Sequence, residues 1–143
     1  MNPVADSTDN RRNYPRRILG AILCLFPLLL LIASAVLHNR PHSAAAMWLL
    51  VPAAAFALLN FHLSVFRPLL YRLWHGSLEE FRFVSGFPLI GTVLALIGGI
   101  VGFGALSAAL IGIGAILVDT GGSFWFLLAT WHDRSLWDDM PLR

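Results

Sequence analysis

The chain has 143 residues, of which 57% are hydrophobic and 13% are charged, and its mean hydropathy is +0.72. An average soluble domain carries about 25% charged residues, so this composition excludes an ordinary soluble protein and indicates an integral membrane protein. The formal net charge is +2. Its arginines lie at the ends of apolar segments rather than in a basic patch with interleaved aromatics, which argues against nucleic-acid binding.

Residues 1–17 are polar and non-periodic, and we expect a disordered cytoplasmic tail. Residues 18–37 form an apolar run long enough to cross a bilayer at about 1.5 Å per residue. Pro27 is expected to kink this first span. A cleaved signal peptide is the alternative, because arginines precede the run and Ala33–Ala35 has the small-x-small form of a cleavage site. The run exceeds the apolar core of about 7 to 15 residues that signal peptides use, which favours a retained span.

The second predicted span covers residues 44–66 and contains Pro52. Residues 67–87 form the longest connector between spans. Four of its apolar side chains share one helical face, with arginines off that face: Leu69, Leu70, Leu73 and Trp74. This pattern predicts a cytoplasmic amphipathic connector with a short helix lying in the membrane interface.

From Pro88 to Trp131 the only charged residue is Asp119, and this stretch is long enough for two crossings. We predict spans at residues 88–105 and 107–130. If the last helix stopped at Asp119, each crossing would measure about 21 Å, which is short of the ~30 Å required. The last span is therefore expected to run through the aspartate, with residues 132–143 as a second cytoplasmic tail. The predicted fold class is an all-α integral membrane protein with four transmembrane helices.

The distribution of arginines predicts the orientation of these four spans. An arrangement with both termini inside places nine arginines on the cytoplasmic side and leaves only Arg40 outside. Such a bias follows the positive-inside rule. We therefore expect a multi-pass protein of the bacterial inner membrane with cytoplasmic N- and C-termini.

Small residues form stripes on the last two predicted spans. Such stripes let helix backbones approach closely in lipid, where packing drives association. We therefore expect a tight glycine-rich C-terminal hairpin. The helix-packing residues are Gly91, Ala95, Gly98 and Gly102 on one span, and Ala108, Gly112, Ala115 and Gly122 on the other.

Asp119 should then point into protein, in a buried polar cluster with Asn60, Thr92 and Thr120. Its carboxyl group is expected either to be neutral and donate a hydrogen bond, or to stay ionised beside Arg67. Ionisable groups inside spans are candidate proton or cation sites. The alternative is a hydrogen-bonded clamp between helices. We favour the clamp, because the other spans carry no carboxylate that would continue a relay.

We expect no catalytic residues, no metal ligands and no cofactor. No nucleophile stands beside a base, and no phosphate-binding glycine loop or metalloprotease helix occurs. The string Asp119-Thr120-Gly121 also occurs in aspartic proteases, but those enzymes are β-rich and pair two aspartates. Cys24 has no second cysteine with which to form a disulfide.

The stretch FRFVSGFPLIGTVLALIG, followed by DTGGSFWF, resembles a pattern found in an uncharacterised family of small bacterial four-span inner-membrane proteins. The resemblance covers residues 81–126. It implies the four-span architecture and no activity. The positions it singles out are Ser85, Gly86, Pro88, Gly91, Thr92, Asp119, Gly121 and Gly122.

Three functions stay open from the sequence. The favoured one is a membrane protein without catalytic chemistry that binds a partner in the bilayer or at its cytoplasmic face, as an accessory subunit or a toxin-immunity protein. The alternative is an oligomeric small transporter or channel that uses Asp119 as a proton or cation site. An intramembrane enzyme is the least favoured. The expected partners are the lipid bilayer and a membrane protein or a second copy of the chain.

Overall fold

The structure is a computed structural model that describes residues 14–77, 79, 81–82, 84 and 86–137. Most of the expected N-terminal tail and the last six residues of the C-terminal tail lie outside the described residues. The described part of the chain is helical, with short connecting segments and no strand, so the all-α prediction is confirmed.

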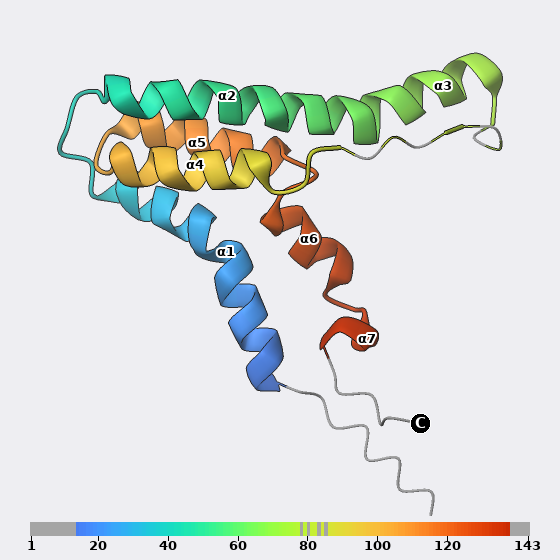
Figure 1. The fold of residues 1–143 in the computed structure, drawn as a ribbon, viewed down its shortest axis with the longest axis horizontal. Helices are drawn as coiled ribbons and strands as arrows, with labels where there is room; N and C mark the ends of the chain where they lie inside the picture. The colour runs from blue at the N-terminus through green and yellow to red at the C-terminus, as the bar shows by residue number, and fades with distance from the viewer. Residues whose placement is uncertain (1–13, 78, 80, 83, 85, 138–143) are drawn as a thin grey trace, which may run out of the picture.

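Eight helical segments follow one another along the described chain (Figure 1). They are α1 (Tyr14–Val36), α2 (Ala44–Phe61), the π-helix η1 (His62–Phe66), α3 (Arg67–His75), α4 (Ile90–Val101), α5 (Leu106–Val118), α6 (Ser123–Thr130) and α7 (Arg134–Trp137). Among the described residues, three helical stretches are long and apolar enough to cross a membrane: Tyr14–Val36, Ala44–His75 and Leu106–Thr130, the last of which includes the interruption between α5 and α6.

The third predicted span, residues 88–105, is shorter than expected. α4 has 12 residues, which corresponds to about 18 Å of helix. Leu89 has φ +64°, a left-handed conformation that cannot continue into a helix, so α4 begins only at the next residue. At the other end a turn centred on Gly104, with φ +84°, follows the helix. The described part of the chain therefore contains three apolar helices long enough to cross a membrane, rather than the four expected.

The short helix expected after residue 66 is present as α3, but it is not separate from the preceding span. α2, η1 and α3 form one uninterrupted helix from Ala44 to His75. Pro68 lacks the N–H that would bond to the Ser64 carbonyl. The π-turn just before it, in which the N–H of Arg67 bonds to His62, is the kind of local widening that helices tolerate. The helix then ends at Gly76 in the left-handed conformation, as many helices do.

The fourth predicted span, residues 107–130, is broken rather than continuous. α5 ends at Val118 and α6 begins at Ser123. Asp119 to Gly122 separate them, and aspartate, threonine and glycine favour caps and turns over helix interiors. The helix is thus completely interrupted at these four residues.

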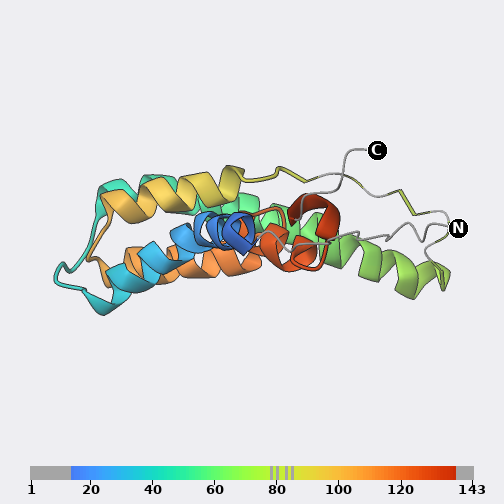
Figure 2. The same cartoon turned by 90° about the horizontal axis from the view of Figure 1, so that it is seen from below.

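α2, α4 and α5 lie side by side, and the second half of α1 packs against α4 and α5 (Figures 1 and 2). α1 bends part-way along its length, consistent with Pro27 inside the helix. The first half of α1 extends away from α2, α4 and α5 and lies beside α6. At one end of the bundle the Asn39 and Arg40 N–H groups donate to the Gly104 carbonyl. At the other, Arg17 of α1 contacts Trp131 beyond α6, so α1 begins where α6 ends.

Small side chains dominate the core, together with Leu31, Leu50 and Ile116. The glycine stripe of α4 does not pair only with α5. A Cβ at Gly98 would lie 2.8 Å from Leu50 of α2, and one at Gly102 would meet both Ala46 of α2 and Ala108 of α5. α4 packs most extensively against α2. The expected two-helix hairpin is therefore part of a three-helix contact in which α2 takes the larger share.

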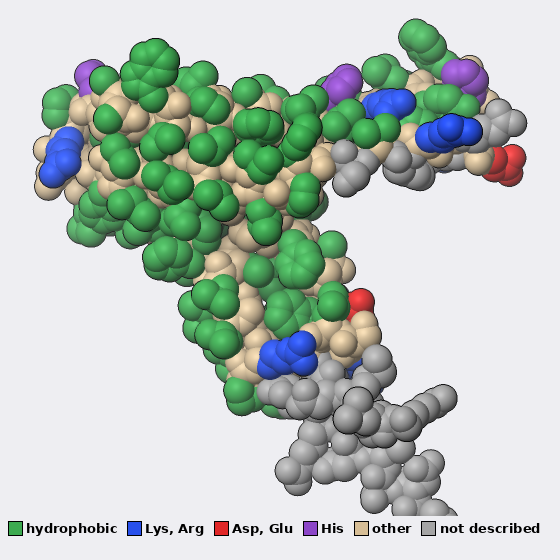
Figure 3. All heavy atoms as spheres, viewed as in Figure 1, with side chains coloured by type: hydrophobic (Ala, Val, Ile, Leu, Met, Phe, Trp, Pro, Cys, Tyr) green, Lys and Arg blue, Asp and Glu red, His purple; other side chains and the backbone are tan. Residues whose placement is uncertain are grey.

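The surface of the bundle is apolar, and its charged side chains gather at the extremities (Figure 3). The large exposed side chains include Ile22, Leu29, Trp48 and Leu110. This distribution is compatible with a multi-pass membrane protein.

Candidate functional site

Asp119 lies in the break between α5 and α6, and its side chain is fully buried. Its Oδ1 accepts hydrogen bonds from Asn60 Nδ2 at 2.6 Å and from the Gly121 N–H at 3.2 Å. Its Oδ2 accepts a bond from the Thr92 hydroxyl at 3.4 Å. The carboxyl group therefore joins α2, α4 and the break itself.

Asn60, buried on α2, makes three hydrogen bonds to two separate parts of the chain. Besides its bond to Asp119, its Nδ2 donates to the Phe87 carbonyl at 2.9 Å, and its Oδ1 accepts from the Phe87 N–H at 2.8 Å. The amide thus pairs with both backbone groups of Phe87, as a neighbouring strand would. Asn60 holds the non-helical approach to α4 against α2.

Thr92, on α4, extends the same network to α6 and α1. Its hydroxyl donates to Asp119 and accepts from the Ser123 N–H at 3.3 Å, at the first residue of α6. The Ser123 hydroxyl in turn donates to the Cys24 carbonyl of α1 at 2.8 Å. The hydrogen bonds therefore connect all the principal apolar helices.

The network also includes hydrogen bonds between backbone groups that lie outside the helices, in the break between α5 and α6 and just before α4. The Gly122 N–H donates to the Asp119 carbonyl, and the Leu89 N–H donates to the Gly121 carbonyl. Unpaired backbone groups at membrane depth cost several kcal/mol each, so irregular backbone is tolerated there only when protein groups bond it. We call Asn60, Thr92 and Asp119, with the backbone of Phe87 and Gly121, the polar clamp.

Thr120 does not join the polar clamp. Its hydroxyl is buried and has no hydrogen-bond partner. Thr120 borders a cavity of about 250 Å³ beside the clamp, whose other lining residues are Asn60, Ser64, Val84, Gly86, Pro88 and Gly121. Of the four predicted cluster residues, the structure brings Asn60, Thr92 and Asp119 into one hydrogen-bonded group and leaves the Thr120 hydroxyl outside it.

Glycines leave room for the side chains of the polar clamp. A Cβ at Gly91 would lie 2.6 Å from Asp119 Oδ2, and one at Gly86 would lie 2.5 Å from Asn60 Oδ1. At Gly122 it would lie 2.5 Å from the Thr92 hydroxyl. These distances are shorter than real Cβ atoms show. Pro88 lies beside these glycines in the sequence, and Ser85, which the resemblance also singles out, lies outside the described residues.

The other helix-packing candidates lie along the same contacts. Ala95 and Ala108 are buried in the core, and Ala115 is nearly so. A Cβ at Gly112 would meet Leu31 of α1 at 2.8 Å. The stripe of small residues on α5 therefore packs against α1 as well as against α4.

Arg67, the alternative ionic partner of Asp119, lies elsewhere. Its guanidinium group stands over the Phe81 ring, 5.6 Å from the ring centroid, at the start of α3. The groups that contact the Asp119 carboxyl are an amide, a hydroxyl and a backbone N–H, and all three donate hydrogen bonds to it.

Two members of the network were missed from the sequence. The hydrogen bonds of Phe87 are made by its backbone, which no side-chain pattern marks, and Ser123 was assigned no role from the sequence. The proline after Phe87 offered a clue, because the residue before proline is pushed out of the helical region and needs another partner for its backbone.

Comparison with protein-family models, with curated proteins and with solved structures gave no match to this chain.

Proposed function

We propose that this chain is a bacterial inner-membrane protein without catalytic chemistry that binds a protein partner at its cytoplasmic face through α3. The observation that carries the proposal is the continuous helix Ala44–His75. Its 32 residues correspond to about 48 Å, whereas the hydrocarbon core is about 30 Å thick. A helix of this length, standing across the bilayer, extends about 18 Å beyond it.

The extension includes all of α3, which presents aromatic, apolar and basic side chains. Trp74 is 83% exposed and Leu73 is 71% exposed. A hollow of about 500 Å³ lies between α3 and the segment that follows it, and Tyr71, Trp74 and Phe81 are among its lining residues. Exposed aromatics beside arginine are typical of the centres of protein interfaces. The composition suits an apolar partner segment that carries carboxylates.

Four crossings remain our proposal for the topology. α4 supplies about 18 Å, and the irregular segment before it lies against α2 through the Phe87–Asn60 hydrogen bonds. That segment adds about 3.3 Å per extended residue, so the pair approaches the required thickness. The contact between Arg17 and Trp131 supports an even number of crossings. The arginine count supports cytoplasmic termini.

The polar clamp stabilises the base of the extension. Asn60 lies two residues before η1, and its bonds to Phe87 and Asp119 fix this end of α2 against the break between α5 and α6. If this end of α2 were mobile, more conformational entropy would be lost when the partner binds. The polar clamp therefore contributes to partner binding by holding α3 in position.

Site-specific photo-crosslinking in the native host tests this function. A photoreactive residue at Leu73 should capture one protein partner, and the pair Leu73→Ala with Trp74→Ala should reduce co-purification of that partner at least tenfold. Trp48 is equally exposed, at 83%, near the opposite end of the same helix. Trp48→Ala with Val51→Ala is therefore the matched control and should leave capture unchanged. Equal losses in both variants, or no crosslinked partner, would refute the proposal.

A second candidate is an oligomeric transporter or channel that uses Asp119 as a proton or cation site. The observation in its favour is the cavity beside Asn60, with the buried, unpartnered hydroxyl of Thr120 at its edge. Asp119→Asn separates the two functions, because an asparagine oxygen still accepts from Asn60 and Gly121 but the ionisable group is gone. If transport is the function, proton or cation flux into liposomes is lost in Asp119→Asn. If the clamp only positions α2, Asp119→Asn retains partner capture and neither protein produces flux.

A further inference from the structure

Two helix interruptions meet where α1 and α6 leave the rest of the bundle (Figure 1). In α1, Pro27 has no N–H to donate to the Leu23 carbonyl one turn earlier, and the helix bends. Between α5 and α6, residues 119–122 form the break described above. The Ser123 hydroxyl donates to the Cys24 carbonyl at 2.8 Å, in the turn that precedes Pro27. A hydrogen bond therefore joins the two interruptions directly.

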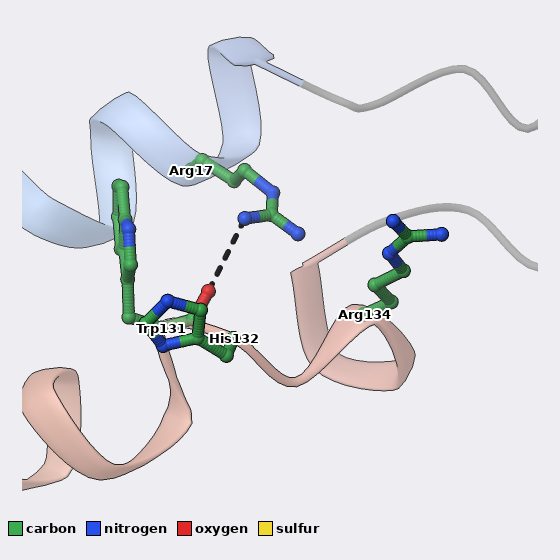
Figure 4. A pocket seen from close by; sticks show the side chains of 4 residues that line it. All are labelled: Arg17, Trp131, His132 and Arg134. Carbon is green, nitrogen blue, oxygen red and sulfur yellow. Dashed lines mark hydrogen bonds between the residues drawn. The ribbon is translucent and has the colours of Figure 1, made fainter.

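The helices beyond these interruptions are bound to one another at their far end (Figure 4). Arg17 Nη1 donates to the Trp131 carbonyl at 3.2 Å, and the guanidinium carbon lies 5.8 Å from the centroid of the Trp131 ring. The buried Trp137 ring packs on Gly20 of α1, and Trp137 Nε1 donates to the Thr130 carbonyl at 2.7 Å. We call the part of α1 before its bend, together with α6 and α7, the arm.

The turn between α6 and α7 is also fixed by hydrogen bonds. The Asp133 N–H donates to the Thr130 carbonyl at 2.9 Å. Asp133 Oδ1 accepts from the Ser135 hydroxyl at 2.6 Å and from the Ser135 N–H at 2.9 Å. These bonds, the hydroxyl first, hold the pKa of Asp133 below its usual range, so it stays ionised as a cap of α7. The arm is therefore bonded internally along its length.

Contacts between the arm and α2, α4 and α5 are concentrated beside the break. α6 packs more extensively against α1 than against α5. Two hydrogen bonds from the first turn of α6 reach the other helices, from the Ser123 N–H to the Thr92 hydroxyl at 3.3 Å and from Trp125 Nε1 to the Leu117 carbonyl at 2.9 Å. Further along the arm, apolar side chains of α1 and α6 are more than half exposed, as at Leu128. Lipid tails are fluid, so the surface that they cover is not held at a fixed angle.

Gly122 is the residue of the break at which the arm can turn. The Gly121 carbonyl, one residue earlier, accepts from the Leu89 N–H at 3.0 Å and so stays with the approach to α4. Ser123, one residue later, bonds to α1 of the arm. A hinge needs only a few residues at the ends of helices to absorb the change in backbone angles.

We propose that the arm pivots as one rigid body about Pro27 and Gly122, while the polar clamp stays formed in the rest of the bundle. α3 and the arm diverge from the bundle (Figure 1), so the motion changes the distance between α3 and α7. The motion requires no partner protein, and its test is therefore independent of the proposed function.

The test is pulsed electron–electron double resonance between pairs of nitroxide labels on the full-length protein in lipid nanodiscs. Cys24→Ala removes the one cysteine of the sequence and keeps the backbone carbonyl that Ser123 contacts. The labels replace side chains that are more than half exposed. Leu19→Cys with Leu58→Cys measures the distance from the arm to α2, Leu19→Cys with Leu128→Cys lies within the arm, and Leu58→Cys with Leu110→Cys lies within the bundle.

We expect the distance distribution between the arm and α2 to be at least twice as wide as either internal distribution. Pro27→Ala restores the missing N–H and should narrow it to the width of the internal pairs. Pro52→Ala makes the same change inside α2 and should leave it unchanged. Three results would overturn the proposal: equal widths for all three pairs, a distribution within the arm as wide as that between the arm and α2, or equal effects of the two proline substitutions.

Discussion

Asn60→Ala is the substitution that tests the polar clamp most severely. It removes three hydrogen bonds, two to the Phe87 backbone and one to Asp119. Side-chain bonds between membrane helices average about 0.6 kcal/mol each, which gives a lower limit near 2 kcal/mol. The buried Asp119 oxygen also loses a donor, and an unsatisfied buried group adds about 1 kcal/mol or more. We expect a loss of about 2 to 3 kcal/mol in unfolding free energy, which is about 30- to 150-fold in the unfolding equilibrium.

Reversible unfolding measures this loss. Sodium dodecyl sulfate is titrated into the protein in dodecyl maltoside micelles, and the helical circular dichroism is followed. Ser64→Ala is the matched control, because Ser64 lies one turn further along the same helix, borders the same cavity and is exposed. Its removal should change the unfolding free energy by less than about 0.5 kcal/mol. If Asn60→Ala costs no more than Ser64→Ala, the hydrogen bonds of Asn60 do not stabilise the fold and the reasoning fails.

Two further predictions concern the surroundings of the clamp and the last helix. Gly91→Ala places a Cβ 2.6 Å from Asp119 Oδ2 and should lower the unfolding free energy by about 1 to 3 kcal/mol in the same assay. Gly114→Ala is the control, because its Cβ meets nothing within 4 Å, and it should be neutral or slightly stabilising. Equal effects of the two substitutions would refute the close packing at Gly91. Ser135→Ala removes the hydroxyl bond that lowers the pKa of Asp133, so that pKa should rise toward its usual range, as measured by NMR titration. Because the folded pKa is lowered, the capping of α7 is present at neutral pH and is lost as the pH falls through the folded pKa; an unchanged Asp133 titration would contradict this.

The sequence predicted the neighbourhood of Asp119 better than the shapes of the helices around it. An aspartate among glycines and alanines indicated a residue facing protein, and Asn60 and Thr92 do contact it. The break beside it was missed, because the length argument assumed that each crossing is one straight helix. The break between α5 and α6 is stabilised by hydrogen bonds from residues that are distant in the sequence.

The remaining differences come from contacts that no local pattern contains. Phe87 bonds to Asn60, 27 residues away, and Arg17 bonds to the carbonyl of Trp131, 114 residues away. The amphipathic pattern of residues 67–75 is the same for a helix lying in the interface and for one that extends α2. The π-turn before Pro68, which decides between these two arrangements, depends on backbone geometry that the sequence does not display.

A double-mutant cycle between Asn60 and Asp119 tests the central claim most directly, because it isolates the hydrogen bond that joins α2 to the break between α5 and α6. The unfolding free energies of the wild-type protein, Asn60→Ala, Asp119→Ala and the double variant are compared under identical detergent conditions. The clamp predicts that the two substitutions together cost less than the sum of the single ones, with a coupling energy of about 1 to 2 kcal/mol. Additive losses, equal to within about 0.3 kcal/mol, would show that the two residues stabilise the protein independently and would contradict the account.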